Sequence, residues 1–212
     1  MKVCKFLIPH IILALFLATF SFASPALATP PSEARQTLEK GIDAVLTDLS
    51  DPALRTPAGR GAVLQRVEAT ISRLFDFREL SARAVGVSWK NFTPDQQQRL
   101  VDNFTTLLRE TYLEKFDTYN GEKVTYLGEV TSTSGKLAEI KTSITLKDTT
   151  IPISYRLINK GSWAVYDVNI EGVSLVQNFR SQFQDVLRAG DANKLIDLVA
   201  KKAEETRNAN KQ

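Results

Sequence analysis

Four consecutive segments of alternating apolar and polar residues, separated by short turns, constrain this fold more than any other feature. Because side chains two apart along a strand point the same way, each segment predicts a strand with one apolar face. Turns this short join antiparallel neighbours. The sequence therefore predicts a four-stranded antiparallel meander with one apolar and one wet face. The predicted strands cover residues 123–131, 136–147, 150–159 and 162–171.

Helical periodicity surrounds these strands. Thr93-Pro94-Asp95-Gln96 is the clearest helix start, with Thr at the N-cap, Pro at N1 and Gln at N3. Residues 56–61 are predicted to form a loop. Helices on one side of an antiparallel sheet give an α+β fold, here with the sheet curved around the long helix that starts at Thr93. The predicted helices cover residues 32–49, 62–74, 76–89, 93–120, 174–190 and 191–207.

The first 28 residues have the pattern of a cleaved export signal. Lys2 and Lys5 precede an almost uninterrupted apolar run, and Ala26-Leu27-Ala28 fits the small-x-small cleavage pattern. A single-pass anchor is the alternative, but the run is short for a span of about 20 residues. We predict that residues 29–212 form one domain after cleavage at Ala28. Its parts are a mainly helical region (29–121), the sheet (122–171) and C-terminal helices (172–212).

Loss of the leader also removes most reactive side chains. The chain's single histidine and single cysteine are His10 and Cys4, so the predicted mature protein has neither imidazole nor thiol. That excludes disulfides, Cys/His zinc sites, and Ser-His-Asp or Cys-His catalysis. We therefore expect no catalytic residue, no cofactor and no metal. Without its two leader lysines, the chain has 25 basic against 24 acidic residues and no basic stripe, which argues against nucleic acid as a partner.

Residues 162–183 run from the last predicted strand through Gly172 into a helix. Ser174 and Gln177 have the spacing of a capping box. Such a corner can close an ordinary core or line a cavity, and the pattern leaves both open. The predicted apolar strand face is Ala164, Tyr166, Val168 and Ile170, and the helix stripe is Leu175, Phe179, Phe183 and Leu187.

Several motifs in this order resemble the MlaC family of periplasmic phospholipid carriers, also called toluene-tolerance proteins. The resemblance covers residues 33–187, and the extra segment 191–212, which contains the last predicted helix, extends beyond the family's usual end. The motifs are Phe75-Asp76-Phe77, Thr93-Pro94-x-Gln96, Tyr119-x-Gly121-x-Lys123-Val124, Trp163-x-Val165-Tyr166-Asp167-Val168, Ile170-Glu171-Gly172-Val173-Ser174-Leu175 and Asn178-Phe179-Arg180-x-Gln182-Phe183.

The resemblance implies a nuclear-transport-factor-like (NTF2-like) sheet and a helical subdomain that enclose an apolar cavity for acyl chains. It also implies a phospholipid ligand, an inner-membrane ABC transporter with an MCE-domain component, and an outer-membrane lipoprotein–porin complex as partners. A related branch is linked to hopanoids. Trp89 and Arg180 are candidates for the head group or mouth. The candidate cavity residues, each of which could equally be ordinary core, are Phe104, Leu108, Tyr112, Phe116, Ile140, Ile144, Ile153, Tyr155, Val168, Ile170, Val173, Phe179 and Phe183.

The physical case for a carrier needs no reactive group. Two acyl chains contain roughly 30 methylenes, and exposing them to water costs on the order of 20 kcal/mol. Apolar side chains suffice to hide them. Two alternatives stand beside the carrier. One is an enzyme that uses Asp167 with Tyr155 or Tyr166, although alternation places Asp167 opposite Tyr166. The other is an interaction module with a filled core.

Overall fold

Five strands in the order β1-β2-β3-β4-β5, all antiparallel, form the sheet of this computed structural model. The four predicted strands are confirmed, and the predicted count of four is wrong by one. Glu171 and Gly172, both with positive φ, reverse the chain so that Val173 pairs with Ile170. The strands are β1 (Lys123–Thr131), β2 (Leu137–Leu146), β3 (Thr149–Asn159), β4 (Trp163–Ile170) and β5 (Val173–Ser174).

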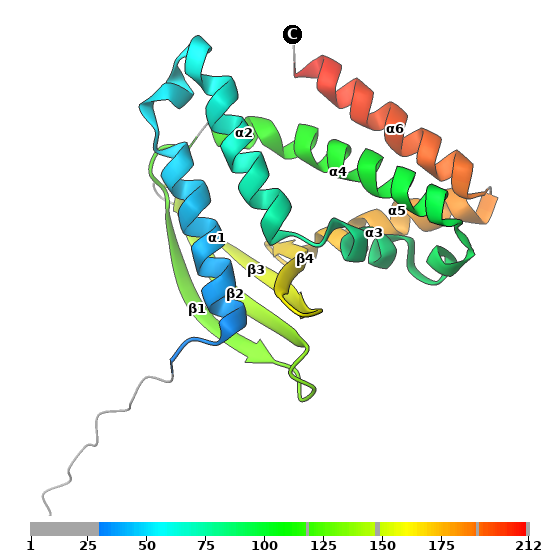
Figure 1. Cartoon of the computed structure of the whole chain (residues 1–212), viewed down its shortest axis with the longest axis horizontal. Coiled ribbons are helices and arrows are strands. Elements are labelled where there is room, and N and C mark those ends of the chain that lie inside the picture. The colour runs from blue at the N-terminus through cyan, green and yellow to red at the C-terminus, as the bar shows by residue number, and fades with distance from the viewer. Residues whose placement is uncertain (1–29, 118, 147–148, 190, 211–212) are drawn as a thin grey trace, which may run out of the picture. The chain divides into compact units, whose positions relative to one another are not determined.

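The structure describes residues 30–117, 119–146, 149–189 and 191–210, and those from Pro31 onward form one compact unit (Figure 1). The predicted export signal, with Cys4 and His10, lies outside the described residues. Within the described part of the chain, no helix combines the length and apolar composition that crossing a membrane requires.

A bulge in β4 changes which of its side chains face the core. Arg156 of β3 pairs with Asp167, but the next residue, Leu157, pairs with Val165, so Tyr166 is the extra residue. Val165 is fully buried in the core that Val168 also contacts. The predicted face of Ala164, Tyr166, Val168 and Ile170 is therefore wrong in its first half, because strict alternation does not continue through a bulge.

Six α-helices accompany the sheet within the described residues. Their starts follow local capping chemistry: Thr93 and Gln96 form both hydrogen bonds of the predicted capping box, at 3.0 and 3.2 Å. The α-helices are α1 (Glu33–Leu49), α2 (Pro57–Leu74), α3 (Phe77–Val85), α4 (Pro94–Asp117), α5 (Leu175–Ala189) and α6 (Ala192–Ala209), and the 3-10 helices are η1 (Pro52–Arg55) and η2 (Gly86–Asn91).

Two predicted helix boundaries were wrong. The expected loop at 56–61 is the first turn of α2, because Thr56 caps the amide of Gly59 and Pro57 occupies N1. The third helix was expected to reach residue 89 but ends at Val85. Gly86 has φ +73°, and the 3-10 helix η2 begins at this residue.

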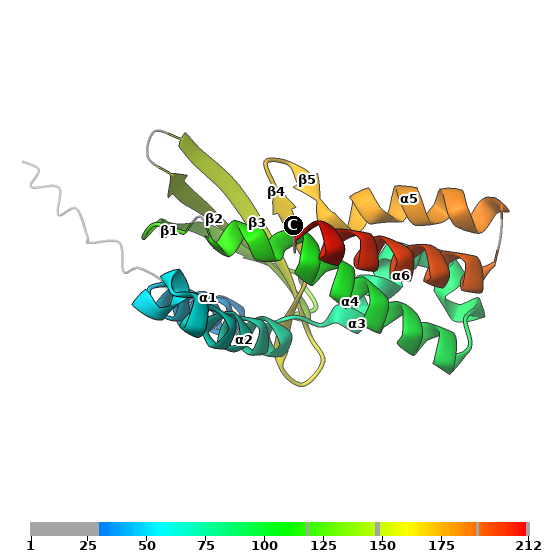
Figure 2. The same ribbon diagram turned by 90° about the horizontal axis from the view of Figure 1, so that it is seen from above.

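The helix that packs on the apolar face of the sheet is α1. Its Ala34 and Leu38 are fully buried against Ile140, Leu157 and Val165. The backbone of α1 runs along the sheet in Figure 1 and in Figure 2. The long helix α4 instead runs beside α6 in both views. The prediction that the sheet curves around the long helix is therefore wrong, because the shorter N-terminal helix takes that place.

A second core fills the space among α3, α4, α5 and α6. Phe104 of α4 is fully buried and contacts Phe179 and Phe183 edge-on, at centroid distances of 4.7 and 5.1 Å. Leu195 and Ile196 of α6 complete this core. The three phenylalanines fix how α5 lies against α4.

Candidate functional site: an apolar cavity

An apolar cavity of about 230 Å³ lies between helices α2 and α4 and the last full strand of the sheet. Residues from α2, α3, α4, β4 and α5, together with Phe75 between α2 and α3, form its wall. The lining residues are Val67, Glu68, Ile71, Ser72, Phe75, Phe77, Leu80, Thr105, Leu108, Arg109, Tyr112, Phe116, Val168, Ile170 and Leu175.

Polar lining residues lie on one edge of the cavity. Glu68 and Ser72 are four apart on α2, and Thr105 and Arg109 are four apart on α4. Residues with this spacing lie one above the other on a helix, so each helix contributes one polar strip. None of these four side chains is buried, whereas the apolar lining residues Val67, Leu80 and Leu108 are. The cavity thus has an apolar interior and one polar rim, which we define as Glu68, Ser72, Thr105 and Arg109.

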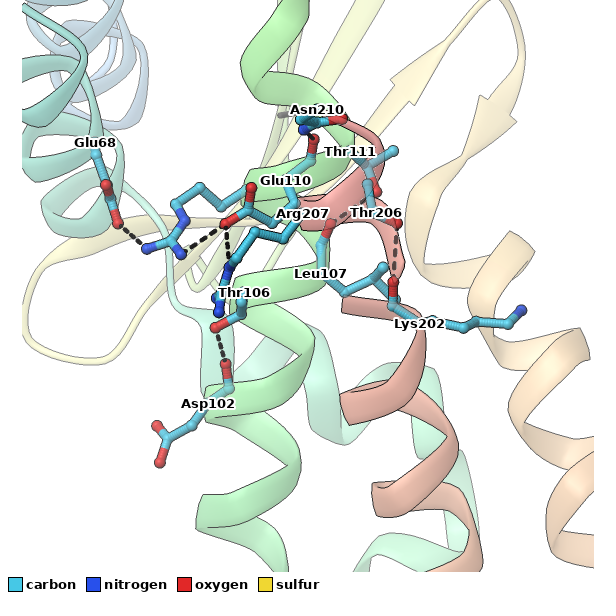
Figure 3. Close-up of polar contacts among 11 residues, drawn as sticks. Glu68, Asp102, Thr106, Leu107, Glu110, Thr111, Lys202, Thr206, Arg207 and Asn210 are labelled. Carbon is cyan, nitrogen blue, oxygen red and sulfur yellow. Dashed lines mark hydrogen bonds and ion pairs between the residues drawn. The ribbon is translucent and has the colours of Figure 1, made fainter. Parts of the chain in front are cut away.

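An ion-pair chain ties this rim to the C-terminal helix (Figure 3). Arg109 donates to Glu68 at 2.9 Å and to Glu110 at 2.8 Å, and Arg207 of α6 donates to Glu110 at 3.2 Å. Asn210 also donates to the Glu110 carbonyl oxygen at 2.8 Å. Glu110 is buried, with only 8% of its side chain exposed. The chain of charges therefore links α2, α4 and α6.

These contacts perturb the titration of the groups. The hydrogen bond to Glu68, opposed by burial, raises the pKa of Arg109, so the guanidinium stays charged. Burial by itself would raise the pKa of the Glu110 carboxyl, but the hydrogen bonds from Arg109 and Arg207 lower that pKa below its ordinary value. Both ends of the buried pair are thus ionised at neutral pH.

Of the thirteen candidate cavity residues, five line this cavity. They come from two elements that are distant in the sequence, α4 and β4, and face the cavity from different sides. These five are Leu108, Tyr112, Phe116, Val168 and Ile170.

The remaining candidates lie elsewhere. Phe104, Phe179 and Phe183 pack against one another in the helical core, because α5 covers that face of α4. Ile140 is fully buried beneath α1. Val173 lies in β5 with 61% of its surface exposed.

Three sheet candidates sit outside the cavity wall, two of them next to it. Ile153 and Tyr155 of β3 pair directly with Ile170 and Val168. Cross-strand partners share one face of a sheet, so these two extend the apolar surface of the wall. Ile144 pairs with Ile151 further along the sheet and is half-buried.

Neither candidate mouth residue lines the cavity. Trp89 lies in η2 and packs against Phe92, with the Arg78 guanidinium over its ring at 5.6 Å. Arg180 donates from Nε and Nη2 to the carbonyl oxygen of Arg83, at 2.9 and 2.6 Å. Its guanidinium thereby satisfies the last turn of α3.

Asp167 holds together the corner between β4 and α5. It is 1% exposed and accepts hydrogen bonds from Ser174, from the Val176 amide and from Arg156. The expectation of a solvated strand face is wrong at this residue, because β5 and the start of α5 cover it.

The contacts of Asp167 are structural, and neither of the tyrosines considered for an enzyme, Tyr155 and Tyr166, is suited to act as a base at neutral pH. Burial raises the pKa of Tyr155 to about 12, and burial also raises that of Tyr166.

Sequence reasoning missed the α2 and α3 side of the cavity. Val67 and Ile71 belong to an apolar helical stripe, but a stripe alone does not show whether a neighbour fills the space opposite. The signal that could have found the rim is the pair of polar residues four apart, Glu68 with Ser72 and Thr105 with Arg109, beside apolar stripes.

Comparison with known proteins gives consistent results. The family model described as MlaC protein matches residues 39–201. The toluene tolerance protein ttg2D of Pseudomonas putida is 26% identical over 190 residues, which cover 87% of this chain and 86% of that protein. A phospholipid-binding protein from Ralstonia solanacearum, solved in complex with a phospholipid, superimposes with a TM-score of 0.74 at 27% identity. That match covers 82% of this chain and 99% of the other.

The family match also corrects one prediction. It extends to residue 201, well into α6, so the last helix does not begin beyond the family's usual end as expected. The matched region contains the whole cavity wall and both helices of its polar rim. This chain therefore belongs to the MlaC family.

Proposed function

We propose that this protein is a phospholipid carrier that holds acyl chains in the cavity behind α2 and α4. The observation that carries the proposal is the division of the cavity into an apolar interior and one polar rim. Acyl chains need the first, since each methylene gains about 0.8 kcal/mol on leaving water. A charged head group needs the second. This division also favours a carrier over an interaction module with a filled core.

The cavity must widen to hold two chains. Its volume of about 230 Å³ is below the ~300–1,000 Å³ of pockets for drug-sized ligands. The apolar surface that continues onto Tyr155 and Ile153 is where the extra space opens. Residue pairing places them beside Val168 and Ile170, so separation of α2 from the sheet exposes them to the same ligand.

We place the carrier in the periplasm, as one component of an Mla-type transport system that maintains outer-membrane lipid asymmetry. Its partners there are an inner-membrane ABC transporter with an MCE-domain component and an outer-membrane lipoprotein–porin complex. Family membership and the export-signal pattern of residues 1–28 support this placement. The task requires no catalytic group, cofactor or metal, since the lipid is moved and not altered.

Extraction of the purified protein tests the carrier function. The full chain is expressed in a Gram-negative host, purified without detergent and extracted with organic solvent, and the lipids are quantified by mass spectrometry. Near-stoichiometric glycerophospholipid is expected. Hopanoid in its place, from a host that makes both, would identify the other lipid class as the cargo. A protein that carries no lipid and takes none from vesicles would be an interaction module.

A further inference from the structure

We propose that the Glu68–Arg109 pair on the polar rim selects phospholipids whose head group carries both a phosphate and an ammonium group. The inference rests on the proposed carrier function and adds the head-group class. Glu68 and Arg109 are the only charged residues among the fifteen that line the cavity in the described part of the chain. Their side chains are 43% and 35% exposed. They thus lie where a head group emerges when its acyl chains occupy the apolar interior.

A buried carboxylate, Glu110, holds the Arg109 guanidinium in place. One arm of its guanidinium contacts Glu110, which is buried and also binds Arg207 of α6. The other arm contacts Glu68, which is far more exposed than Glu110. An incoming anion therefore displaces Glu68 and leaves the Glu110 contact intact. A guanidinium binds phosphate oxygens through short, charge-assisted hydrogen bonds, which suits it to a phosphodiester.

Displacement of Glu68 leaves a free carboxylate beside the bound phosphate. In phosphatidylethanolamine the ammonium is joined to the phosphate by two carbons, so it reaches this carboxylate. One exposed ion pair is then replaced by two, Arg109 with phosphate and Glu68 with ammonium. Phosphatidylglycerol brings the phosphate without the cation, and its negative charge faces an unpaired Glu68. Opposite charges attract and like charges repel at this range, so the rim discriminates between the two head groups.

Vesicles that contain equal amounts of phosphatidylethanolamine and phosphatidylglycerol provide the test. Delipidated full-length protein is loaded from them, re-isolated and extracted, and both lipids are measured by mass spectrometry. The native protein is expected to take up more phosphatidylethanolamine. Glu68→Gln should lower the ratio of the two lipids about two- to fivefold, the range expected for one exposed ion pair. Glu68→Lys should reverse the preference.

A matched control removes a carboxylate from a different ion pair, one that joins α1 to α2. Asp48 of α1 accepts from Arg66 of α2 at 2.8 Å, outside the cavity wall. Asp48→Asn makes the same chemical change as Glu68→Gln and should leave the lipid ratio unchanged. A ratio that is the same in the native protein and in both Glu68 variants overturns the head-group proposal. The carrier function then still stands, since total bound lipid measures it independently.

A further experiment tests whether Arg109 recognises the phosphate of a lipid head group or any free phosphate. The loading is repeated with 10 mM inorganic phosphate in the buffer, roughly a ten-thousandfold excess over protein at about 1 μM. The lipid ratio is expected to stay unchanged, because a phosphate without acyl chains lacks the apolar contribution to binding. Loss of the preference in phosphate would mean that Arg109 is a general anion site, which contradicts head-group selection.

Discussion

Helix α4 presents phenylalanines to two regions that differ in what lies opposite. Phe104 faces α5 and α6 and is fully buried among Phe179, Phe183 and other core side chains. Phe116, three turns on, lines the cavity and is half-buried. The two residues are chemically identical and belong to one apolar stripe. Their different roles come from their neighbours, since side chains of α5 and α6 surround Phe104, whereas Phe116 borders the cavity that Val168 and Ile170 of β4 also line.

The largest expected effect is the difference in unfolding free energy between alanine variants of these two phenylalanines. Phe104→Ala should cost about 3–5 kcal/mol of unfolding free energy, because it opens a void in a filled core. Phe116→Ala should cost less than about half of that, because half-buried Phe116 borders an existing cavity and packs only at the margin of the core between α1 and α2. Urea unfolding monitored by circular dichroism measures both. Equal costs would show that the two regions are packed alike.

The same comparison shows which features of the fold and of the cavity can be predicted from the sequence alone. Alternation and short turns predicted four of the five strands, and capping at Thr93 predicted the start of α4, because both are local properties. The bulge at Tyr166 depends on pairing with β3 and was missed. The assignment of cavity residues depends on packing in the same way. Phe183 and Val168 both lie on apolar faces, and only tertiary packing decides that one fills a core and the other lines a space.

The next effect, about 2 kcal/mol, concerns lipid retention. Ile170 lines the cavity and is 37% exposed, so Ile170→Asp should fold while placing a carboxylate against the acyl chains. Bound lipid is expected to fall at least about 30-fold. Val173→Asp is the matched control, since Val173 is three residues away and outside the wall. Mass spectrometry of extracted lipid measures both variants. If both retain lipid at the native level, β4 is not part of the binding wall.

A third prediction concerns Glu110, at the boundary between the filled core and the cavity rim. Glu110→Gln should cost about 1–2 kcal/mol at pH 7, because Arg109 and Arg207 lose their shared buried anion. The native carboxyl has a lowered pKa, so its contribution to stability is full above its unfolded-state pKa. That contribution disappears as the pH falls through the lowered folded-state value.

Urea unfolding of both proteins at several pH values between neutral and about 3 measures this difference. The gap between native protein and Glu110→Gln should narrow as the pH falls. Asp185→Asn serves as the comparison, because Asp185 pairs with Arg188 on an exposed part of α5. Its stability should follow that of the native protein throughout. A gap for Glu110→Gln that widens toward low pH would contradict the assignment of a stabilising buried anion.

The smallest expected effect concerns the hydrogen bonds of buried tyrosine hydroxyl groups in the core beneath α1. The Tyr126 hydroxyl is buried and has no hydrogen-bond partner among the described residues, and burial raises its pKa. Tyr126→Phe removes an unsatisfied polar group and should stabilise the protein by up to about 1 kcal/mol. Tyr155→Phe in the same core removes a hydroxyl that interacts with Thr142, so it should destabilise by a similar amount. Opposite signs in urea unfolding would show that polar satisfaction, and not residue type, sets the stability of this core. A loss of stability in both variants would mean that Tyr126 has a partner, such as a buried water, that holds β1 to the sheet.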